Sequence, residues 1–246
     1  WDLDIYSTGT FSNINSLQAI EVMTDESRNF NLRAYPYLVI KPIQGLTLRS
    51  QFNMNYGFST SEFFRPSTVS TIYNPPPQAA QGSYNTGSSF NWQLENTATY
   101  DKKIGNHQFN VLAGYTRERY HSISSSLTGR QYASDMIRTI NHSVEQTGSS
   151  SESNWSMISY LARLNYDYDL KYLLSASIRR DGSSRFGPDS RWGYFPSVSV
   201  GWNISREGFF PETDWLTNLK LRSSYGYSGN NNIGDYTWIP TLATNN

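Results

Sequence analysis

The chain has 246 residues with 20 basic and 20 acidic side chains, so its formal net charge is zero, and it contains no cysteine. Neutrality leaves no electrostatic footprint for nucleic acid, and the lack of thiols excludes disulfides and thiolate metal sites. No apolar run approaches the ~20 residues that a membrane-spanning helix needs. Because aromatic residues nevertheless make up 15% of the chain, two classes stay open: a soluble β-protein, and a transmembrane β-barrel.

In chain order, the first segments with a period of two are an irregular one at 30–40 and a regular one at 46–58. In 46–58, Leu48, Phe52 and Met54 share one parity, while Arg49 and Gln51 share the other. Thirteen residues at about 3.3 Å each give a strand roughly 43 Å long. Strands of soluble proteins are usually about 5–6 residues, whereas a tilted membrane strand needs about 9–11, so the length favours a barrel wall.

The same alternation predicts six further strands, for a total of about eight. They span residues 90–100, 109–116, 158–168, 172–179, 198–204 and 219–228.

The connections alternate in length. Tight turns are expected at 41–45, 102–106 and 169–171, and long polar loops at 59–89, 122–153 and 181–191. The connection at 206–217 is longer than the other short ones and is expected to hold a helical turn at 211–215. Short turns at one end and long loops at the other are typical of outer-membrane barrels. The pattern therefore predicts an all-β fold and favours an antiparallel transmembrane β-barrel over the soluble β-protein, which stays open.

Four arginines fall on the polar parities of these strands: Arg49, Arg163, Arg179 and Arg222. Arginine on the lipid face would cost about 2–4 kcal/mol at the bilayer midplane, so these side chains are predicted to face the lumen. There they could line a transport path or hold a plug through ion pairs, and the pattern leaves both roles open.

Three linked blocks carry a family resemblance. They are Ser175-Ala-Ser-Ile-Arg-Arg-Asp-Gly-Ser-Ser-Arg-Phe-Gly187, then Arg191-Trp-Gly-Tyr-Phe-Pro-Ser-Val-Ser-Val-Gly-Trp-Asn-Ile-Ser205, then Leu219-Lys-Leu-Arg-Ser-Ser-Tyr-Gly-Tyr-Ser-Gly-Asn230 with Ile233-Gly-Asp-Tyr236. In this order and spacing they resemble SusC/RagA-type TonB-linked outer-membrane proteins. Ser228 stands where the family pattern suggests Thr, and Arg206 where it suggests an acidic residue.

The positions that match the family motifs are as follows: Arg179, Asp181, Gly182, Arg185, Phe186, Gly187, Arg191, Trp192, Gly193, Phe195, Pro196, Ser197, Gly201, Trp202, Leu219, Lys220, Arg222, Tyr225, Gly226, Gly229, Asn230, Ile233, Gly234 and Tyr236.

The resemblance implies a barrel of about 22 strands with an N-terminal plug. Residues 1–246 would then be a partial barrel domain without the plug, and both ends would be cuts in a longer chain. It further implies active import of a large nutrient, an oligosaccharide or a peptide, across the outer membrane of a Gram-negative bacterium. The implied partners are a SusD-like surface lipoprotein that acts as a lid, the TonB complex through a part outside this chain, and outer-membrane lipid, with no nucleic acid.

Several candidate sites have a competing structural interpretation. The loop from Arg180 to Gly187 could contact ligand or lid, but Asp-Gly and Phe-Gly are turn chemistry and its charges could pair with each other. Its acidic spacing does not fit a calcium loop. Trp192, Tyr194 and Trp202 could stack on sugar rings, but an interfacial aromatic girdle is the simpler expectation.

Nothing in the sequence indicates catalysis, a cofactor or a metal. His107, His121 and His142 lack the spacing of a paired-histidine metal site, and neither a nucleophile elbow nor a phosphate-binding loop is present. The resemblance therefore carries the functional prediction, which is non-enzymatic TonB-dependent import. The alternatives are a surface binding or adhesion barrel and a passive porin, with a barrel-embedded hydrolase last.

Overall fold

The computed structural model describes residues 16–69, 79–211 and 215–239, which form long strands and very little helix. One short helix, α1 (Ser16–Val22), precedes the strands. The strands are β1 (Thr24–Ala34), β2 (Tyr37–Ile40), β3 (Leu46–Arg65), β4 (Gln81–Ile104), β5 (His107–Tyr132), β6 (Ser143–Tyr168), β7 (Tyr172–Ser183), β8 (Trp192–Asn203) and β9 (Lys220–Gly226). Three 3₁₀ turns, η1 (Ile140–His142), η2 (Pro188–Ser190) and η3 (Ile204–Arg206), lie in the connections.

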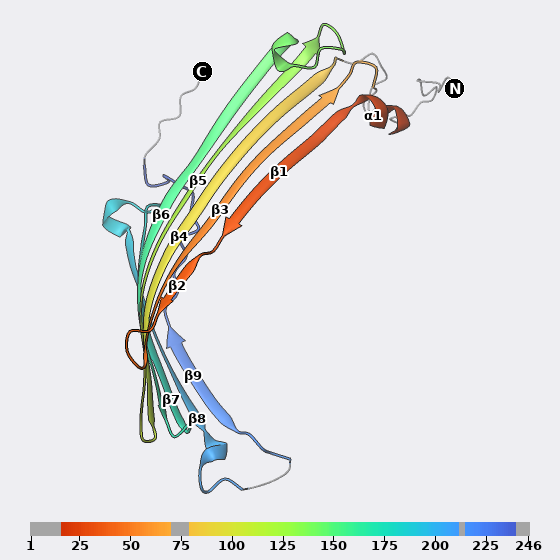
Figure 1. Cartoon of the computed structure of the whole chain (residues 1–246). Coiled ribbons are helices and arrows are strands. Elements are labelled where there is room, and N and C mark those ends of the chain that lie inside the picture. The colour runs from red at the N-terminus through yellow and green to blue at the C-terminus, as the bar shows by residue number, and fades with distance from the viewer. Residues whose placement is uncertain (1–15, 70–78, 212–214, 240–246) are drawn as a thin grey trace. The chain divides into compact units, whose positions relative to one another are not determined.

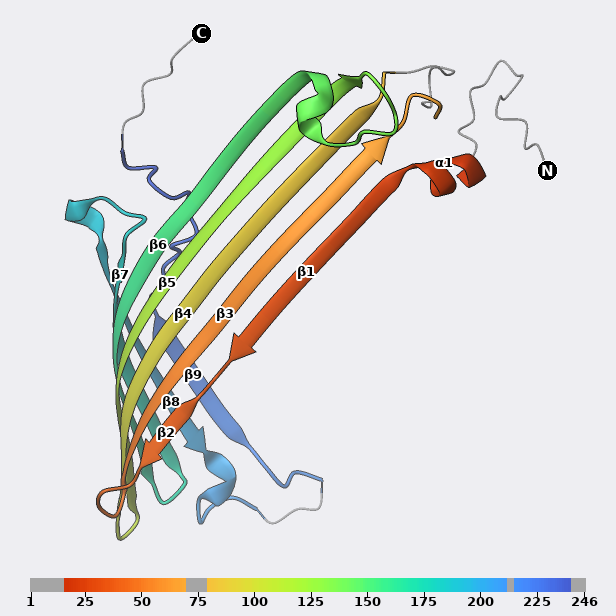
Figure 2. The same ribbon diagram turned by 45° about the horizontal axis from the view of Figure 1, so that its top comes forward.

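The strands follow one another in a single antiparallel sheet, in the order β1-β3-β4-β5-β6-β7-β8-β9 with β2 also paired to β3. Figures 1 and 2 show that β3 to β6 lie side by side in this order and that β7, β8 and β9 do so too. The sheet has nine strands and not about eight, because the expected strand at 30–40 is split at Tyr35-Pro36. Proline has no N–H for the ladder, but its carbonyl still accepts from the Phe52 N–H at 3.0 Å.

The chain clusters into two compact units. One comprises residues 1–32, 55–90 and 121–153, and the other comprises 33–54, 91–120 and 154–246. Here they are called the outer-loop unit and the short-turn unit. The buried hydrophobic side chains of the described residues, Phe64, Val69 and Ala80, all belong to the outer-loop unit, where Phe64 packs edge-on against Tyr132 at 5.2 Å between ring centroids.

The three tight turns are at the expected places in the short-turn unit. Gly45 and Gly105 have φ of 88° and 58°, values that glycine adopts without steric cost. Asp169 and Leu170 have φ of 53° and 55°, and the Asp167 carboxylate accepts from the Leu170 N–H at 2.7 Å. Two successive positive φ angles are the geometry of a two-residue hairpin turn.

The predicted long loops were too long, because the strands extend into them. Residues 59–65 and 81–89 continue β3 and β4, residues 122–132 and 143–153 belong to β5 and β6, and β7 runs to Ser183. The signal was missed because Ser, Thr and Asn fill both parities there, so the polarity no longer alternates. The Pro75-Pro76-Pro77 run lies outside the described residues, as does most of the expected helical turn at 211–215.

The two faces of the sheet in the short-turn unit have different chemistry. In the β7–β8 register Leu174 pairs with Val200 and Ala176 with Val198, whereas Ser175 pairs with Ser199. The apolar side chains are uncovered: Val200 is 53% exposed and Leu221 is 62% exposed. A soluble protein rarely leaves so large an apolar surface free, which argues against the soluble alternative. No helix of the described residues is long and apolar enough to cross a membrane.

Candidate functional site

Polar side chains on one face of the short-turn unit are joined by hydrogen bonds that run across the strands. From β4 to β7, Asn110 donates to Asp101 at 2.7 Å, Asn165 donates to Asn110 at 3.1 Å, and Ser175 donates to Asn165 at 2.7 Å. These four residues belong to four consecutive strands, and Asn110, Asn165 and Ser175 were predicted to lie on the polar face. The polar face is therefore a connected network, as buried or partly buried polar groups require.

The network lines a groove of about 670 Å³. Lys103, Lys220 and Arg222 supply positive charge, and Asp101 and Asp167 supply negative charge. Arg222 lies opposite Gly201 in the β8–β9 register. A Cβ atom at that glycine would lie 3.3 Å from the Leu173 side chain and 3.6 Å from Lys220 Cε. Such a groove, with charges of both signs, can hold a polar ligand through hydrogen bonds.

The four arginines expected to face the lumen all lie on this polar face, at separate places. Arg49 donates to Gln51, and its guanidinium lies 5.1 Å from the centre of the Tyr37 ring. Arg163 pairs in register with Ser177. Arg179 binds Asp181 at 2.7 Å and Ser159 at 3.3 Å, and Arg222 lies in the groove described above. The structure does not bring them together into one site.

The three sequence blocks do meet at one place, a pocket of about 470 Å³ at the long-loop end of β7 and β8. It is lined by residues of every block, including Arg179, Phe186, Trp192, Phe195 and Asn230. Arg185 ties the first block to the third: its Nε donates to Asp235 at 2.8 Å and its Nη1 to the Asn231 carbonyl at 3.2 Å. The side chains of Arg185 and Asp235 are only 16% and 12% exposed.

Glycines in the blocks allow close packing around this pocket. A Cβ atom at Gly182 would come within 2.7 Å of the Trp192 ring, and one at Gly193 within 2.6 Å of the Phe195 ring. A Cβ at Gly229 would also collide with Phe195. Since the aromatic rings fill the space that side chains would need, these motif positions have a packing role. The turn and charge-pairing interpretation of the Arg180–Gly187 loop accounts for the contacts of Arg185.

The polar face of the outer-loop unit is rich in hydroxyl groups, and the residues that line its groove carry no charge. Ser126 donates to Asn85 at 2.6 Å, Asn85 donates to Ser61 at 3.1 Å, and Ser124 shares a 2.7 Å hydrogen bond with Ser151. Together with Ser, Thr, Asn and Gly neighbours they line a groove of about 630 Å³, called here the hydroxyl groove. The sequence interpretation placed most of these serines in loops, where serine is common and indicates no site.

Aromatic rings crowd the opposite face of the short-turn unit in two bands. Beside the short turns, Phe109 and Tyr166 lie 5.1 Å apart and Tyr168 and Tyr172 lie 6.3 Å apart. Toward the long loops, Tyr115 and Tyr160 lie 5.4 Å apart and Tyr160 and Trp192 lie 6.3 Å apart. Two aromatic bands separated by small apolar residues are the pattern of interfacial girdles.

Glu207, which sequence reasoning missed, ties the 204–219 connection to the short-turn band. Its Oε1 accepts from Tyr172 Oη at 2.7 Å and from Trp202 Nε1 at 3.0 Å, and Lys171 lies 3.6 Å from Oε2. The hydrogen bond from Tyr172, followed by that from Trp202 and the charge of Lys171, lowers the pKa of the Glu207 carboxyl. Glu207 directly follows Arg206, the position where the family pattern suggests an acidic residue.

The three histidines remain apart: His107 lies beside Tyr166 and Tyr168, His121 beside Glu152, and His142 beside Thr139. Within 16–69, 79–211 and 215–239, no group of three or more His, Asp or Glu residues could hold a metal ion.

Comparison with known proteins gives a consistent family. No family model matches the chain. TonB-dependent receptor P39 of Formosa agariphila is 33% identical over 239 residues, which cover 95% of this chain and 23% of that protein. TonB-dependent receptor SusC of Bacteroides thetaiotaomicron is 34% identical over 60% of this chain and 15% of its own length. The solved RagAB peptide importer in its open-open state superposes with a TM-score of 0.80 at 25% identity, over 94% of this chain and 26% of that one.

The chain belongs to the SusC/RagA-type TonB-linked outer-membrane proteins. P39 and the RagAB importer match nearly the whole chain, and the chain spans about a quarter of the length of each. The chain is a part of such a barrel in the Gram-negative outer membrane. The matched proteins are receptors and transporters and not enzymes.

Within this SusC/RagA-type segment, two groups of residues escaped the sequence interpretation. Glu207 was overlooked because a lone acidic residue in a connection has no periodic signal. The hydroxyl groove was overlooked because its serines were assigned to loops, and the two apolar residues near Ser124 and Ser126, Ile123 and Leu127, are too few to show an alternation.

Proposed function

We propose that the full-length protein takes up a large polar nutrient, an oligosaccharide or a peptide, by TonB-dependent active import. The observation that carries the proposal is the match, over nearly the whole chain, to TonB-dependent receptors and to the RagAB peptide importer. In this proposal the polar face lines the lumen and residues 1–246 belong wholly to the barrel domain. A plug and the segment that contacts TonB lie elsewhere in the protein.

The two grooves of the polar face support a polar cargo. The hydroxyl groove offers hydrogen-bond donors and acceptors without charge, and the groove with Lys220 and Arg222 adds charges of both signs. Arg49, Arg163, Arg179 and Arg222 would line the path or hold the plug. A SusD-like surface lipoprotein would cover the extracellular end and help to capture the cargo. The solved peptide importer favours peptides, whereas the uncharged groove suits sugars equally well.

Uptake measured with and without the proton motive force tests the proposal. Cells that produce the full-length protein are given a labelled peptide digest in one arm and labelled oligosaccharides in another, with and without a protonophore and in a TonB-deficient strain. Active import predicts accumulation of one cargo class that stops in both treated cells. Accumulation that continues without TonB would support a passive porin, and surface binding with no accumulation would support an adhesion barrel.

Exchanging the groove charges separates the path role from plug anchoring. The double substitution Lys220→Gln/Arg222→Gln is expected to lower uptake several-fold while leaving the barrel in the outer membrane. If the pair anchors the plug instead, the variant should gain ion conductance in a planar bilayer, because a loosened plug opens the lumen. Arg130→Gln, an exposed arginine of the outer-loop unit, serves as the control for loss of one charge.

A further inference from the structure

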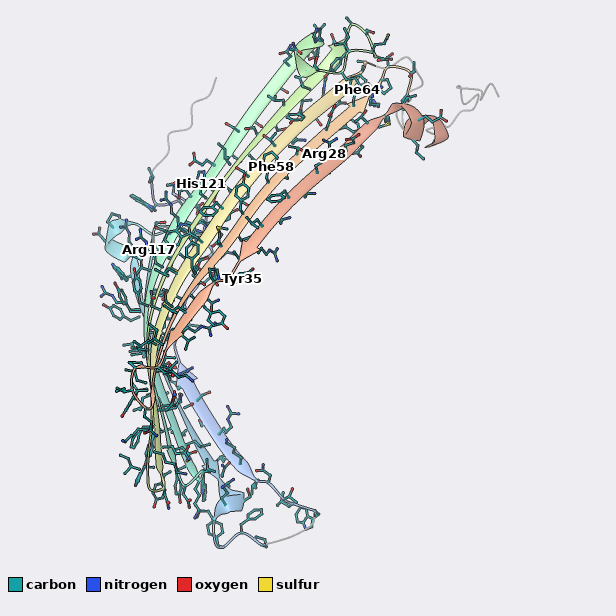
Figure 3. All side chains as sticks on the ribbon, in the orientation of Figure 1. Arg28, Tyr35, Phe58, Phe64, Arg117 and His121 are labelled. Atoms are coloured by element: carbon teal, nitrogen blue, oxygen red, sulfur yellow. The ribbon has the colours of Figure 1, made fainter. Side chains whose placement is uncertain are left out.

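Three arginines lie on the aromatic face of the short-turn unit, although an apolar face disfavours charged side chains. Arg180 pairs in register with Tyr194 of β8 and with Tyr160 of β6, and its guanidinium lies 4.2 Å above the Trp192 ring and 5.3 Å from that of Tyr194. Arg117 lies 5.6 Å from the Trp92 ring and is labelled in Figure 3. Arg119 follows it on the same parity of β5 and is exposed.

These arginines, called here the arginine belt, lie at similar heights along the strands. Arg180 lies eight residues beyond Tyr172, and Arg117 eight beyond Phe109, which is about 26 Å along a strand and about 20 Å along the membrane normal at a tilt near 40°. An apolar band is about 25 Å tall, so both arginines lie near the edge of the band at the long-loop end. That end faces outward in outer-membrane barrels.

Within the described strands of the short-turn unit, no Asp or Glu occupies the aromatic-face parity, so the belt has no acidic partner there. Besides the belt, the basic side chains of that parity in these strands are His107 and Lys102, both beside a short turn. The ion pairs recorded among the described residues involve other side chains, such as Arg179 with Asp181 and Arg185 with Asp235 on the polar side. A guanidinium stacked on an aromatic ring keeps donors at its edge for an external oxyanion.

We propose that the arginine belt binds the phosphate groups of a phosphorylated glycolipid in the outer leaflet of the outer membrane. Charge complementarity supports this occupant: arginine forms bidentate hydrogen bonds with phosphate oxygens, and the neighbouring Trp and Tyr rings favour the headgroup level. The lipid chains would cover the apolar residues below, between the two aromatic bands. The belt would thus fix the depth of the barrel and stabilise it through its lipid, independently of the transported cargo.

Thermal unfolding of the full-length protein in defined lipid tests the proposal. The protein is reconstituted in phosphatidylcholine vesicles alone, with lipid A, and with dephosphorylated lipid A. The wild type should unfold at a higher temperature with lipid A than with either other composition. In a binding titration with lipid A, each arginine contributes about fivefold in affinity, so Arg117→Gln/Arg119→Gln/Arg180→Gln should bind about a hundredfold more weakly.

Two controls decide between outcomes. Lys41→Gln removes a charge at a short turn and should keep the full lipid A effect. Arg180→Lys keeps the positive charge and should keep part of the effect, so it separates loss of lipid binding from misfolding of the glutamine variants. Equal stabilisation by dephosphorylated lipid A, or a triple variant that binds lipid A as the wild type does, would overturn the proposal. Stabilisation by free inorganic phosphate without lipid A would also overturn it, since the site would then take an anion and not a lipid.

Discussion

Arg185 and Asp235, fifty residues apart in the chain, form a hydrogen-bonded ion pair of 2.8 Å between Nε and Oδ1 that links the first family block to the third. The Arg185 guanidinium also lies 4.7 Å from the centre of the Trp155 ring. One side chain therefore joins the β7–β8 connection, the segment after β9 and the polar face of β6.

Arg185→Gln should lower the free energy of unfolding of the full-length barrel by about 1.5–3 kcal/mol, the range for hydrogen bonds to charged groups. It should also expose the 184–191 connection to protease before the strands unfold. Arg130→Gln, an exposed arginine in the outer-loop unit, is the matched control and should change neither quantity. Equal protease resistance of the Arg185→Gln and Arg130→Gln variants would show that the ion pair does not hold this connection.

The Glu207 carboxylate should make the 204–219 connection sensitive to acid. Since the folded pKa lies below the ordinary value of 4.5, this group contributes stability above the unfolded pKa, and that contribution is lost as the pH falls through the folded pKa. Limited proteolysis of the connection measured from neutral pH downward should show opening below pH 4.5.

Glu207→Gln should open the connection already at neutral pH, and its difference from the wild type should vanish in acid. Asp189→Asn, an exposed carboxylate in η2, is the control and should follow the wild type. If the Glu207→Gln variant stays closed at neutral pH, the hydrogen bonds from Tyr172 and Trp202 do not depend on the charge.

Gly182 should tolerate no side chain, because an added Cβ would come within 2.7 Å of the Trp192 ring, which in turn lies under Arg180. Gly182→Ala should cost about 1–3 kcal/mol of stability through overpacking. It should also shift the tryptophan fluorescence of the folded protein. Gly208→Ala offers the comparison, since a Cβ there meets nothing within 4 Å. Similar stability of the two variants would mean that Trp192 moves aside freely.

The sequence predicted the class of fold and the faces of the strands well where one face is apolar. Between Tyr172 and Asn203 the expected parities of Leu174, Val198 and Val200 agree with the observed register, because a slip of one residue would turn every apolar side chain toward the polar face. The same reasoning failed beyond Ser59 and Ser122. Strand ends that stand in water on both faces need no apolar residues, so Ser-rich strands and Ser-rich loops look alike in sequence.

The site could be predicted only in part. The three blocks identify the family, yet nothing in their spacing reveals that Arg185 reaches Asp235 or that Trp192 fills the space above Gly182. Those contacts depend on how the two connections fold over the strand ends. Arg180 was assigned to a loop, and its place on the aromatic face follows only from its register with Tyr160 and Tyr194.

The assignment of the two faces to lipid and lumen can be tested at neighbouring positions of β8. Val200 lies on the aromatic face opposite Leu174, and Ser199 lies on the polar face opposite Ser175. Val200→Arg would place a charge in the apolar band at a cost of about 2–4 kcal/mol near the midplane, so the full-length variant should fail to accumulate as a folded barrel. Ser199→Arg should assemble normally, since its side chain meets the polar groove. The measurement is the amount of each variant that resists detergent unfolding in outer-membrane fractions. Equal assembly of the two variants, or preferential loss of Ser199→Arg, would show that the faces are assigned the wrong way or that this sheet does not meet lipid.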